Sequence, residues 1–195
     1  MHVPIFALST VLFPGGRLPL RVFEARYLDM IKTCMANATP FGVCLIAQGQ
    51  EVGVAASVHD MGTLAHVADF DLLDGGLLGI VADGGERFKI VSTDIGDDQL
   101  LNATTSPVAV EPVTSIPSEL EHLVGITQAL LEHLENEHAQ AHSQCDDATW
   151  VSNRLAESLP MPSEQRQSLL EMGDPVVRLQ ALAAIVTTLM QQHPD

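Results

Sequence analysis

The sequence predicts an α+β protein, with strands in its first part and helices after them. Up to about Pro112, short apolar runs alternate with turn residues, which is typical of strands. The composition then changes over Glu111–Pro117, where two prolines and small polar residues indicate a linker. Beyond the linker, apolar residues recur at spacings of three and four, the period of helices. We therefore expect a strand-rich subdomain over residues 1–112 and a helical bundle over residues 118–192.

The amino-terminal segment predicts two strands, a turn and a helix in succession. The turn signal is Phe13-Pro14-Gly15-Gly16, because proline fixes φ and glycine tolerates positive φ. Over residues 18–23, successive side chains alternate between a buried and an exposed face, the period of a strand. Pro19 cannot donate a ladder hydrogen bond, so this strand belongs at a sheet edge or a bulge. From Glu24 onward the apolar residues follow helical spacing.

Further short apolar runs are candidate strands, and the glycine pairs between them are predicted hairpin turns at Asp74-Gly75-Gly76 and Asp83-Gly84-Gly85. The runs are Phe41–Ala47, Val52–His59, Thr63–Leu72, Leu77–Ala82, Arg87–Thr93 and Leu100–Val110. If such a sheet closes on itself, its edges are hidden.

Capping residues predict where the helices begin. Ser118 and Glu121 form a capping-box pair ahead of a long apolar stripe. The other starts are predicted at Asp146 or Asp147, at Ser163, and at Asp174 with Pro175 in the first helical position.

The chain is strongly acidic, with 9 basic against 25 acidic residues and a formal net charge of −16. Such a protein repels phosphate backbones and anionic lipid headgroups, so we expect no binding to nucleic acid or membranes. We find no signal peptide and no apolar run of bilayer length. The three cysteines, Cys34, Cys44 and Cys145, are too few and too scattered for a disulfide framework, which suits the reducing cytoplasm.

Several short motifs follow one another along nearly the whole chain. They are Leu12-Phe-Pro-Gly15, Leu18-Pro-Leu20, Phe23-Glu24, Arg26-Tyr27, Phe41-Gly42-Val43, Gly62-Thr63-Leu64-Ala65, Gly85-Glu86-Arg87-Phe88, and Gln167-Ser-Leu-Leu-Glu171 with Asp174 and Arg178-Leu179. In this order they resemble the Lon protease amino-terminal domain, the LON substrate-binding domain. The resemblance implies a PUA-like β-pseudobarrel followed by a C-terminal α-helical bundle. It also implies a stand-alone member without ATPase or protease domains.

We find no set of residues that predicts catalysis. Lys32-Thr33 matches the last pair of a nucleotide-binding loop, but no glycine-rich loop precedes it. The chain also lacks a Gly-x-Ser-x-Gly elbow and the context of the Lon proteolytic dyad. We therefore expect neither ATP hydrolysis nor peptide cleavage, and no cofactor.

The weak candidates for a metal site are His138, His142 and Cys145, where the two histidines share one helix face at i, i+4. Together they could offer nitrogen and sulfur ligands to Zn²⁺. The alternative is a solvated helix end, since the neighbouring residues are polar and histidine near a helix carboxyl end favours the helix dipole. We expect no structural metal here.

Other motif residues predict structure rather than binding. Glu24 and Arg26 lie where the second strand turns into a helix, and partly buried charges require partners, so we expect them to pair there. Arg87 is expected to form a fixed salt bridge. Gly62 and Thr63 complete this structural set.

The resemblance implies a non-catalytic polypeptide-recognition module that binds unfolded or apolar polypeptide segments or a protein partner, and we expect it to act as an adaptor for protein quality control. Its expected surface is an apolar patch plus an exposed strand edge that could accept a peptide strand. The candidate partner-binding residues are Phe13, Pro14, Leu18, Phe23 and Tyr27. Two alternatives stay open: these residues build the core, or the chain is a small-ligand or metal-dependent enzyme that uses the cleft between barrel and bundle.

Overall fold

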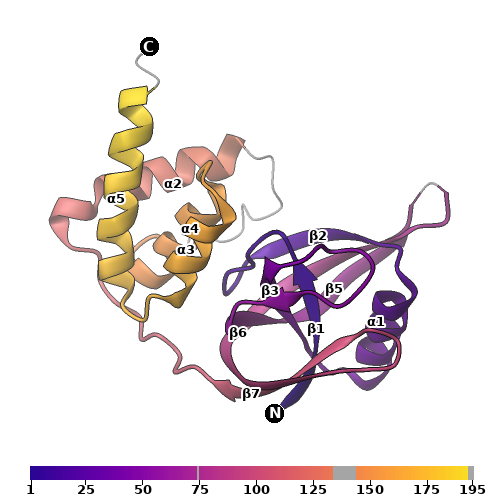
Figure 1. The fold of residues 1–195 in the computed structure, drawn as a ribbon. Coiled ribbons are helices and arrows are strands. Elements are labelled where there is room, and N and C mark those ends of the chain that lie inside the picture. The colour runs from indigo at the N-terminus through magenta and orange to yellow at the C-terminus, as the bar shows by residue number, and fades with distance from the viewer. Residues whose placement is uncertain (74, 134–143, 193–195) are drawn as a thin grey trace. The chain divides into compact units, whose positions relative to one another are not determined.

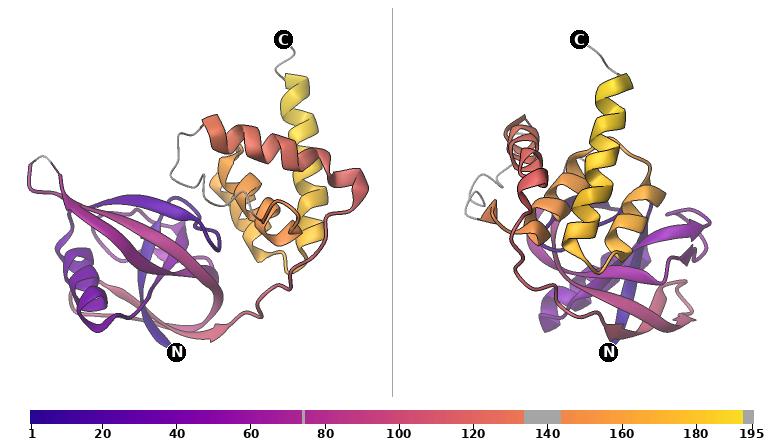
Figure 2. Two further views of the ribbon diagram at one scale, coloured as in Figure 1. Left: turned by 180° about the vertical axis from the view of Figure 1, so that it is seen from behind. Right: turned by 90° about the vertical axis from the view of Figure 1, so that its left-hand side faces the viewer.

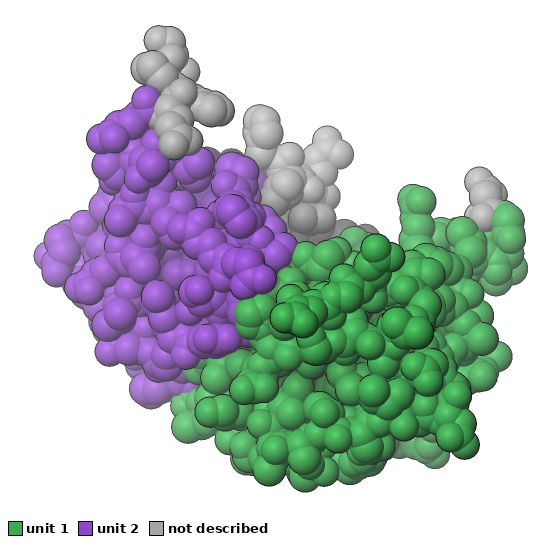
Figure 3. Space-filling view, in the orientation of Figure 1, with its two compact units in different colours: residues 1–110 green, residues 111–195 purple. Residues whose placement is uncertain are grey.

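The computed structural model describes residues 1–73, 75–133 and 144–192. The chain divides into two compact units, residues 1–110 and residues 111–195, coloured green and purple in Figure 3. The first unit holds all the strands and one helix, and the second holds only helices among its described residues (Figure 1). The predicted α+β class is therefore confirmed.

The strands of the first unit form a sheet that closes on itself. In order along the chain they are β1 (His2–Leu8), β2 (Arg17–Val22), β3 (Phe41–Gln48), β4 (Ser57–Val58), β5 (Met61–Leu72), β6 (Leu78–Ile95) and β7 (Leu101–Pro107). Neighbouring strands follow the order β1-β7-β6-β5-β3, and β3 returns to β1 as its parallel neighbour. β2 lies outside this ring and pairs with β6, whereas β4 pairs with the end of β3.

Apolar side chains fill the inside of the ring and the face that is covered by helix α1 (Ala25–Asn37). The larger cluster contains Phe6, Leu12, Tyr27, Ile31 and Phe41, among other residues. Phe6 stacks on Tyr27 with ring centroids 4.1 Å apart. The helical stripe that was predicted after Glu24 is thus the buried face of α1.

The prediction of a hairpin at Asp83-Gly84-Gly85 is wrong, because β6 runs through these residues without a break. Gly84 instead packs against the amino-terminal turn. Its N–H donates to the Gly16 carbonyl at 2.8 Å, and its carbonyl accepts from the Gly15 N–H at 2.8 Å. A Cβ on Gly84 would overlap the Phe13 carbonyl oxygen. Glycine therefore serves close backbone approach here rather than chain reversal.

The other predicted glycine turn is present at Gly75 and Gly76, whereas its first residue, Asp74, lies outside the described residues. Gly75 and Gly76 have positive φ angles of 81° and 78°, which L side chains rarely adopt. They link β5 to β6, and the two strands extend as a paired hairpin well beyond the ring (Figures 1 and 2).

Two predicted strands are shorter than expected. Of Val52–His59 only Ser57–Val58 pairs in a ladder, because polar contacts to Glu51 hold the preceding loop. The strand predicted over Leu100–Val110 ends at Pro107, which has no N–H to continue the ladder.

The second unit contains η1 (Ser118–Leu120), α2 (His122–His133), α3 (Ala148–Ser158), α4 (Ser163–Glu171) and α5 (Pro175–Gln192). The predicted caps of α3 and α5 are confirmed. Asp147 accepts a hydrogen bond from the Thr149 N–H at 3.1 Å, and Asp174 accepts one from the Val176 N–H at 2.8 Å. The predicted capping box at Ser118 and Glu121 is wrong. Ser118 begins a separate 3₁₀ turn, and its hydroxyl contacts Glu119.

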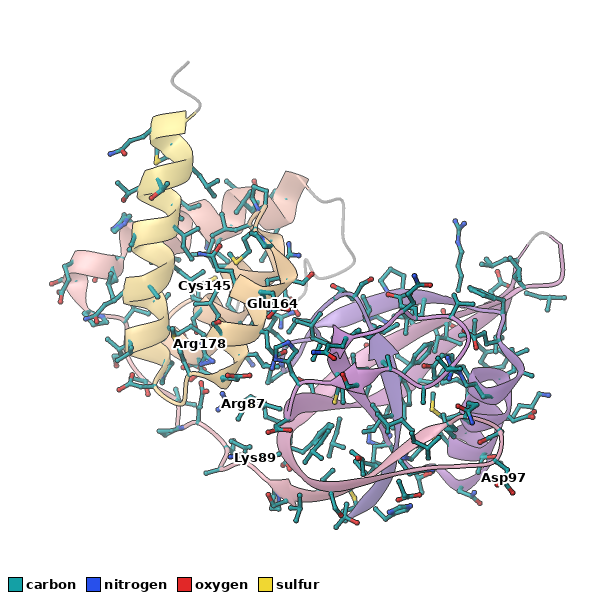
Figure 4. The ribbon with its side chains drawn as sticks, in the orientation of Figure 1. Arg87, Lys89, Asp97, Cys145, Glu164 and Arg178 are labelled. Atoms are coloured by element: carbon teal, nitrogen blue, oxygen red, sulfur yellow. The ribbon has the colours of Figure 1, made fainter. Side chains whose placement is uncertain are left out.

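Among the described residues of the second unit, Arg178 of α5 is the largest fully buried side chain (Figure 4). Its guanidinium binds both carboxylate oxygens of Glu111, the first residue of the unit, and its Nε donates to the Ser152 hydroxyl at 3.2 Å. This fork ties the start of the unit to α3 and α5. In the described part of the chain, no helix is long and apolar enough to cross a membrane.

Candidate peptide-binding edge

The candidate site is built around β2, whose one ladder among the described residues is with β6. Arg17 lies opposite Asp83 and Val22 opposite Leu78, with no shift of register between them. The other side of β2 is therefore an open edge, as Pro19 predicts.

The ladder determines which backbone groups of β2 point toward the open edge. The bond from the Gly84 N–H to the Gly16 carbonyl marks residues 16 and 84 as a hydrogen-bonded pair. Because bonding alternates along an antiparallel ladder, Leu18, Leu20 and Val22 bond to β6. The carbonyls of Pro19 and Arg21 and the Arg21 N–H consequently point away from β6.

The first of two hollows, which we name the edge pocket, is a cavity of about 150 Å³ beside this open edge. Its lining residues are Phe6, Leu8, Pro19, Leu20, Arg21, Val22, Phe23, Glu24, Tyr27 and Glu51. Tyr27 is buried, and this burial raises the pKa of its hydroxyl, although nearby Arg26 opposes the shift. Phe23 is 58% exposed. The pocket therefore combines aromatic and aliphatic side chains with the charged groups of Arg21, Glu24 and Glu51, close to backbone groups that point away from β6.

The second hollow, which we name the outer groove, lies across β2, β6 and β5 and has a volume of about 400 Å³. Its lining residues are Pro19, Leu20, Arg21, Asp69, Phe70, Asp71, Leu73, Gly79, Ile80 and Val81. Cross-strand partners share one face of a sheet, so the side chains of Arg21 and Asp71, on either side of Gly79, are on the same face. A Cβ on Gly79 would come within 3.0 Å of the Leu73 side chain, so glycine keeps this groove open.

Arg26 fixes the polar wall of the edge pocket. Its Nε lies 3.1 Å from the Glu24 carboxylate, which confirms the predicted pair. Its two terminal nitrogens donate to the carbonyls of Gln99 at 2.8 Å and Glu51 at 3.1 Å. The guanidinium also lies 4.6 Å from the centre of the Tyr27 ring. One buried side chain thus joins the start of α1 to two separate loops.

Thr63 holds the segment before the amino-terminal turn, and Gly62 packs against the neighbouring strands. The Thr63 hydroxyl donates to the Leu12 carbonyl at 2.6 Å, and its side chain is fully buried. A Cβ on Gly62 would lie 2.5 Å from both the Cys44 sulfur and the Val43 carbonyl, so only glycine fits between these strands. Arg87, also in this predicted structural set, is buried, and its expected salt bridge stays a prediction.

The predicted partner-binding residues are distributed between core and surface. Phe13 has no exposed surface, so the expectation that it forms part of a binding surface is wrong. Leu18 packs partly against the core, and Pro14 is half-buried. Tyr27 and Phe23 both line the edge pocket.

Sequence reasoning missed several lining residues. Phe6 and Leu8 of β1 reach the pocket only because the sheet closes, and no local pattern marks them. Arg21 follows Pro19 on the predicted edge strand, and this position was the available signal.

The candidate metal ligands His138 and His142 lie outside the described residues. Cys145 is half-buried and lies 3.4 Å from the Gln128 side-chain nitrogen. Among the residues that the structure describes, no group of three or more His, Cys, Asp or Glu side chains is placed to hold a metal ion. Burial raises the pKa of the Cys44 thiol to about 12, as expected of a core thiol rather than a nucleophile.

The closed sheet, with β2 and β4 outside the ring, and the unit of helices after it have the fold of an amino-terminal domain of the Lon type. The chain belongs to the family of the ATP-dependent protease La (LON) substrate-binding domain, whose model matches residues 2–188. This family is a substrate-binding domain and not a catalytic one.

Among curated proteins, the chain is 25% identical over 194 residues to Lon protease 2 of Myxococcus xanthus, covering 94% of this chain and 23% of that protein. It is 24% identical over 200 residues to Lon protease 2 of Herpetosiphon aurantiacus, covering 96% of this chain and 24% of that protein. The chain thus spans about a quarter of the length of these relatives.

Among solved structures, the chain is similar to the Lon N-terminal domain protein from Xanthomonas campestris. The TM-score is 0.80 at 33% identity, covering 94% of this chain and 98% of that one. The N-terminal domain of Mycobacterium avium complex Lon protease shares the fold, with a TM-score of 0.65 at 18% identity and coverage of 93% and 96%.

Proposed function

We propose that this chain is a non-catalytic recognition module that binds extended polypeptide segments by adding them as a strand to the open edge of β2. The observation that carries the proposal is the open edge directly beside a pocket with aromatic and aliphatic walls. Strand addition takes its affinity from backbone hydrogen bonds and its selectivity from pockets for alternate side chains. Membership of a substrate-binding family supports the same function.

The register of an added strand follows from β2. A peptide residue opposite Arg21 can bond to both its N–H and its carbonyl, whereas Pro19 offers only a carbonyl. The residue between them, opposite Leu20, points its side chain to the inner face, where the edge pocket lies. We therefore expect this central peptide residue to be apolar and to anchor the segment.

The size of the edge pocket favours a side chain over a small-molecule substrate. Its volume of about 150 Å³ is below the range of roughly 300–1,000 Å³ that is typical of ligand sites. Its acidic residues already have partners, since Glu24 pairs with Arg26 and Glu51 accepts from Ser9. This favours recognition over the alternative of an enzyme.

Affinity for a single segment is expected to be weak. Each ordered peptide residue loses conformational freedom, and only a few backbone bonds and one small pocket offset that loss. We propose that the segments are those of unfolded proteins in the cytoplasm, and that the chain acts as an adaptor in protein quality control.

The test uses a neutral fluorescent peptide, with Thr-Leu-Val at its centre, and fluorescence anisotropy. Arg21→Pro removes the edge N–H without removing a bond to β6, so it should weaken binding about fivefold, the worth of one hydrogen bond of about 1 kcal/mol. Arg21→Thr keeps this N–H and should bind the neutral peptide as well as the original protein.

A second pair of variants tests the pocket. Phe23→Ala removes an exposed wall and should weaken binding, whereas Val91→Ala, at an exposed site outside both hollows, should not. Equal binding by all variants, or no saturable binding by the original protein, would exclude recognition at this edge.

A further inference from the structure

Arg21 is an exposed cation on the open edge strand. Its guanidinium makes no ion pair with any residue in the described ranges, whereas several other cations have partners. Those pairs are Arg17 with Asp83, Arg26 with Glu24, Arg154 with Glu157 and Arg178 with Glu111. In a chain of net charge −16, Arg21 thus places a positive charge, without an ion-pair partner among the described residues, at the proposed binding edge.

We propose that Arg21 selects peptide segments that carry an aspartate or glutamate next to an apolar residue. This inference rests on the proposed function, because it assigns the residue that the same edge would accept opposite Arg21. Directly opposed residues of neighbouring strands have their Cβ atoms about 4.5–5.5 Å apart, so their side chains interact. Opposite charges at such a pair stabilise the ladder and like charges destabilise it.

The nearby acidic residues do not cancel this charge at the added strand. Asp69 and Asp71 belong to β5, two strands from Arg21 on the side away from the open edge. An added strand would lie about 14 Å from β5, at strand spacings of about 4.8 Å. This distance exceeds the Debye length of about 8 Å at physiological salt, so the carboxylates of β5 are largely screened there.

The two carboxylates nearest the pocket lie off the edge strand. Glu24 faces the buried guanidinium of Arg26, and Glu51 accepts from the backbone N–H and the hydroxyl of Ser9, neutral groups that leave it its negative charge. Arg21 is on β2 itself, so its charge is the one directly opposite a residue of an added strand.

The register places one residue of the added peptide opposite Arg21 and so predicts which peptide sequence is preferred. In an antiparallel strand, the residue opposite Arg21 comes first, the residue opposite Leu20 second, and the residue opposite Pro19 third. The first and third share the outer face with Arg21 and Pro19, and the second enters the edge pocket. The preferred order is therefore acidic, apolar, apolar.

The test compares three labelled peptides that differ at one position: Glu-Leu-Val, Thr-Leu-Val and Lys-Leu-Val in the same neutral frame. The original protein should bind the Glu peptide about fivefold to tenfold more tightly than the Lys peptide, from one favourable and one unfavourable exposed pair. Arg21→Glu should reverse this order, and Arg21→Thr should abolish it. The preference should also shrink at high salt.

The outcomes distinguish this inference from the function on which it rests. If all three peptides bind equally to the original protein and to Arg21→Glu, Arg21 does not select the segment, although edge binding stands. A preference for Glu that survives in Arg21→Glu would overturn the assignment to this residue. If no peptide binds, edge recognition itself is overturned. Arg21 is exposed and outside the core, so the melting temperature should be the same for all variants.

Discussion

Replacing Arg26 by methionine should destabilise the first unit strongly. The Arg26 side chain joins Glu24 to the loops that contain Glu51 and Gln99, and no other cation links these three segments in the described contacts. The substitution leaves the carbonyls of Gln99 and Glu51 without their donor and Glu24 without its cation. Each unsatisfied carbonyl costs about 1 kcal/mol or more. With the broken ion pair, whose side chains are 5% and 18% exposed, the expected loss is about 3–4 kcal/mol.

A matched control lies on the same helix. Lys32 pairs with Asp29 at 3.5 Å, but these side chains are 72% and 75% exposed. Such a pair is worth less than about 0.5 kcal/mol, so Lys32→Met should unfold almost as the original protein does. Arg26→Lys, which keeps a charge but not the planar fork, should fall between the two methionine variants.

Urea unfolding followed by far-UV circular dichroism measures the difference. With a slope of about 2 kcal/mol per molar urea, Arg26→Met should lower the midpoint by about 1.5–2 M, and Lys32→Met by less than about 0.3 M. If Arg26→Met keeps the original midpoint and loses only peptide binding, the residue serves recognition and its structural role is refuted. Equal midpoints for Arg26→Met and Lys32→Met would refute it as well.

Three further predictions concern the scaffold. Gly84→Ala should prevent stable folding or cost several kcal/mol of unfolding free energy, because the new Cβ would overlap the Phe13 carbonyl oxygen. Gly125→Ala is the control, since Gly125 has open space around it in α2, and it should stabilise the protein by about 0.5–1 kcal/mol. The melting temperatures of the two variants measure the difference. Arg178→Met should cost about 3–5 kcal/mol by leaving the buried Glu111 carboxylate without its partner, and urea unfolding should show a much smaller loss when Glu111→Leu is added to it. Cys44 should resist thiol reagents in the folded protein at pH 8, because its pKa is raised to about 12. The unfolded thiol ionises near 9.0, so between pH 9 and 12 ionisation favours the unfolded state and the free energy of unfolding should fall. In a pH series, the urea midpoint of the original protein should therefore fall more steeply over this range than that of Cys44→Ala.

Local chemistry in the sequence predicted the elements that depend on neighbours in the chain. Asp147 and Asp174 cap helices because a side-chain oxygen needs only the N–H two residues later. Pro19 indicates an edge because its missing donor is a property of one residue. These features require no knowledge of what packs against the segment.

Long-range contacts account for what the sequence did not predict. Asp74-Gly75-Gly76 and Asp83-Gly84-Gly85 have the same composition, yet the chain turns at Gly75 and Gly76, whereas β6 runs through the second sequence without a break. The second is extended because the turn at residues 13–16 rests on it, and that contact joins residues about 70 positions apart in the printed sequence. A glycine needed for space has the same local signature as one needed for positive φ.

In the candidate site too, local sequence predicted some features and long-range contacts determine the others. Pro19 indicated the open edge, but the pocket beside it depends on Phe6 and Leu8, which β1 brings there through its pairing with β3 and β7. The sequence also did not distinguish Phe13 from Phe23, since both are aromatic residues next to a turn or strand end. One is enclosed on all sides and the other is 58% exposed.

The motifs that identify the family and the side chains that would select a segment belong largely to different sets. The family motifs are structural: Gly62 fits closely between strands, Thr63 donates a buried hydrogen bond, and Arg26 forms a buried ion pair. Substitutions at these positions should therefore lower the stability of the fold. Arg21 is exposed, and its guanidinium makes no ion pair in the part of the chain that the structure describes. The N-terminal domain of Mycobacterium avium complex Lon protease shares the fold at a TM-score of 0.65 with only 18% identity, so the fold does not require a particular residue at an exposed edge position. It follows that the choice of segment must be read from the open edge of each protein and not from the motifs that place it in the family.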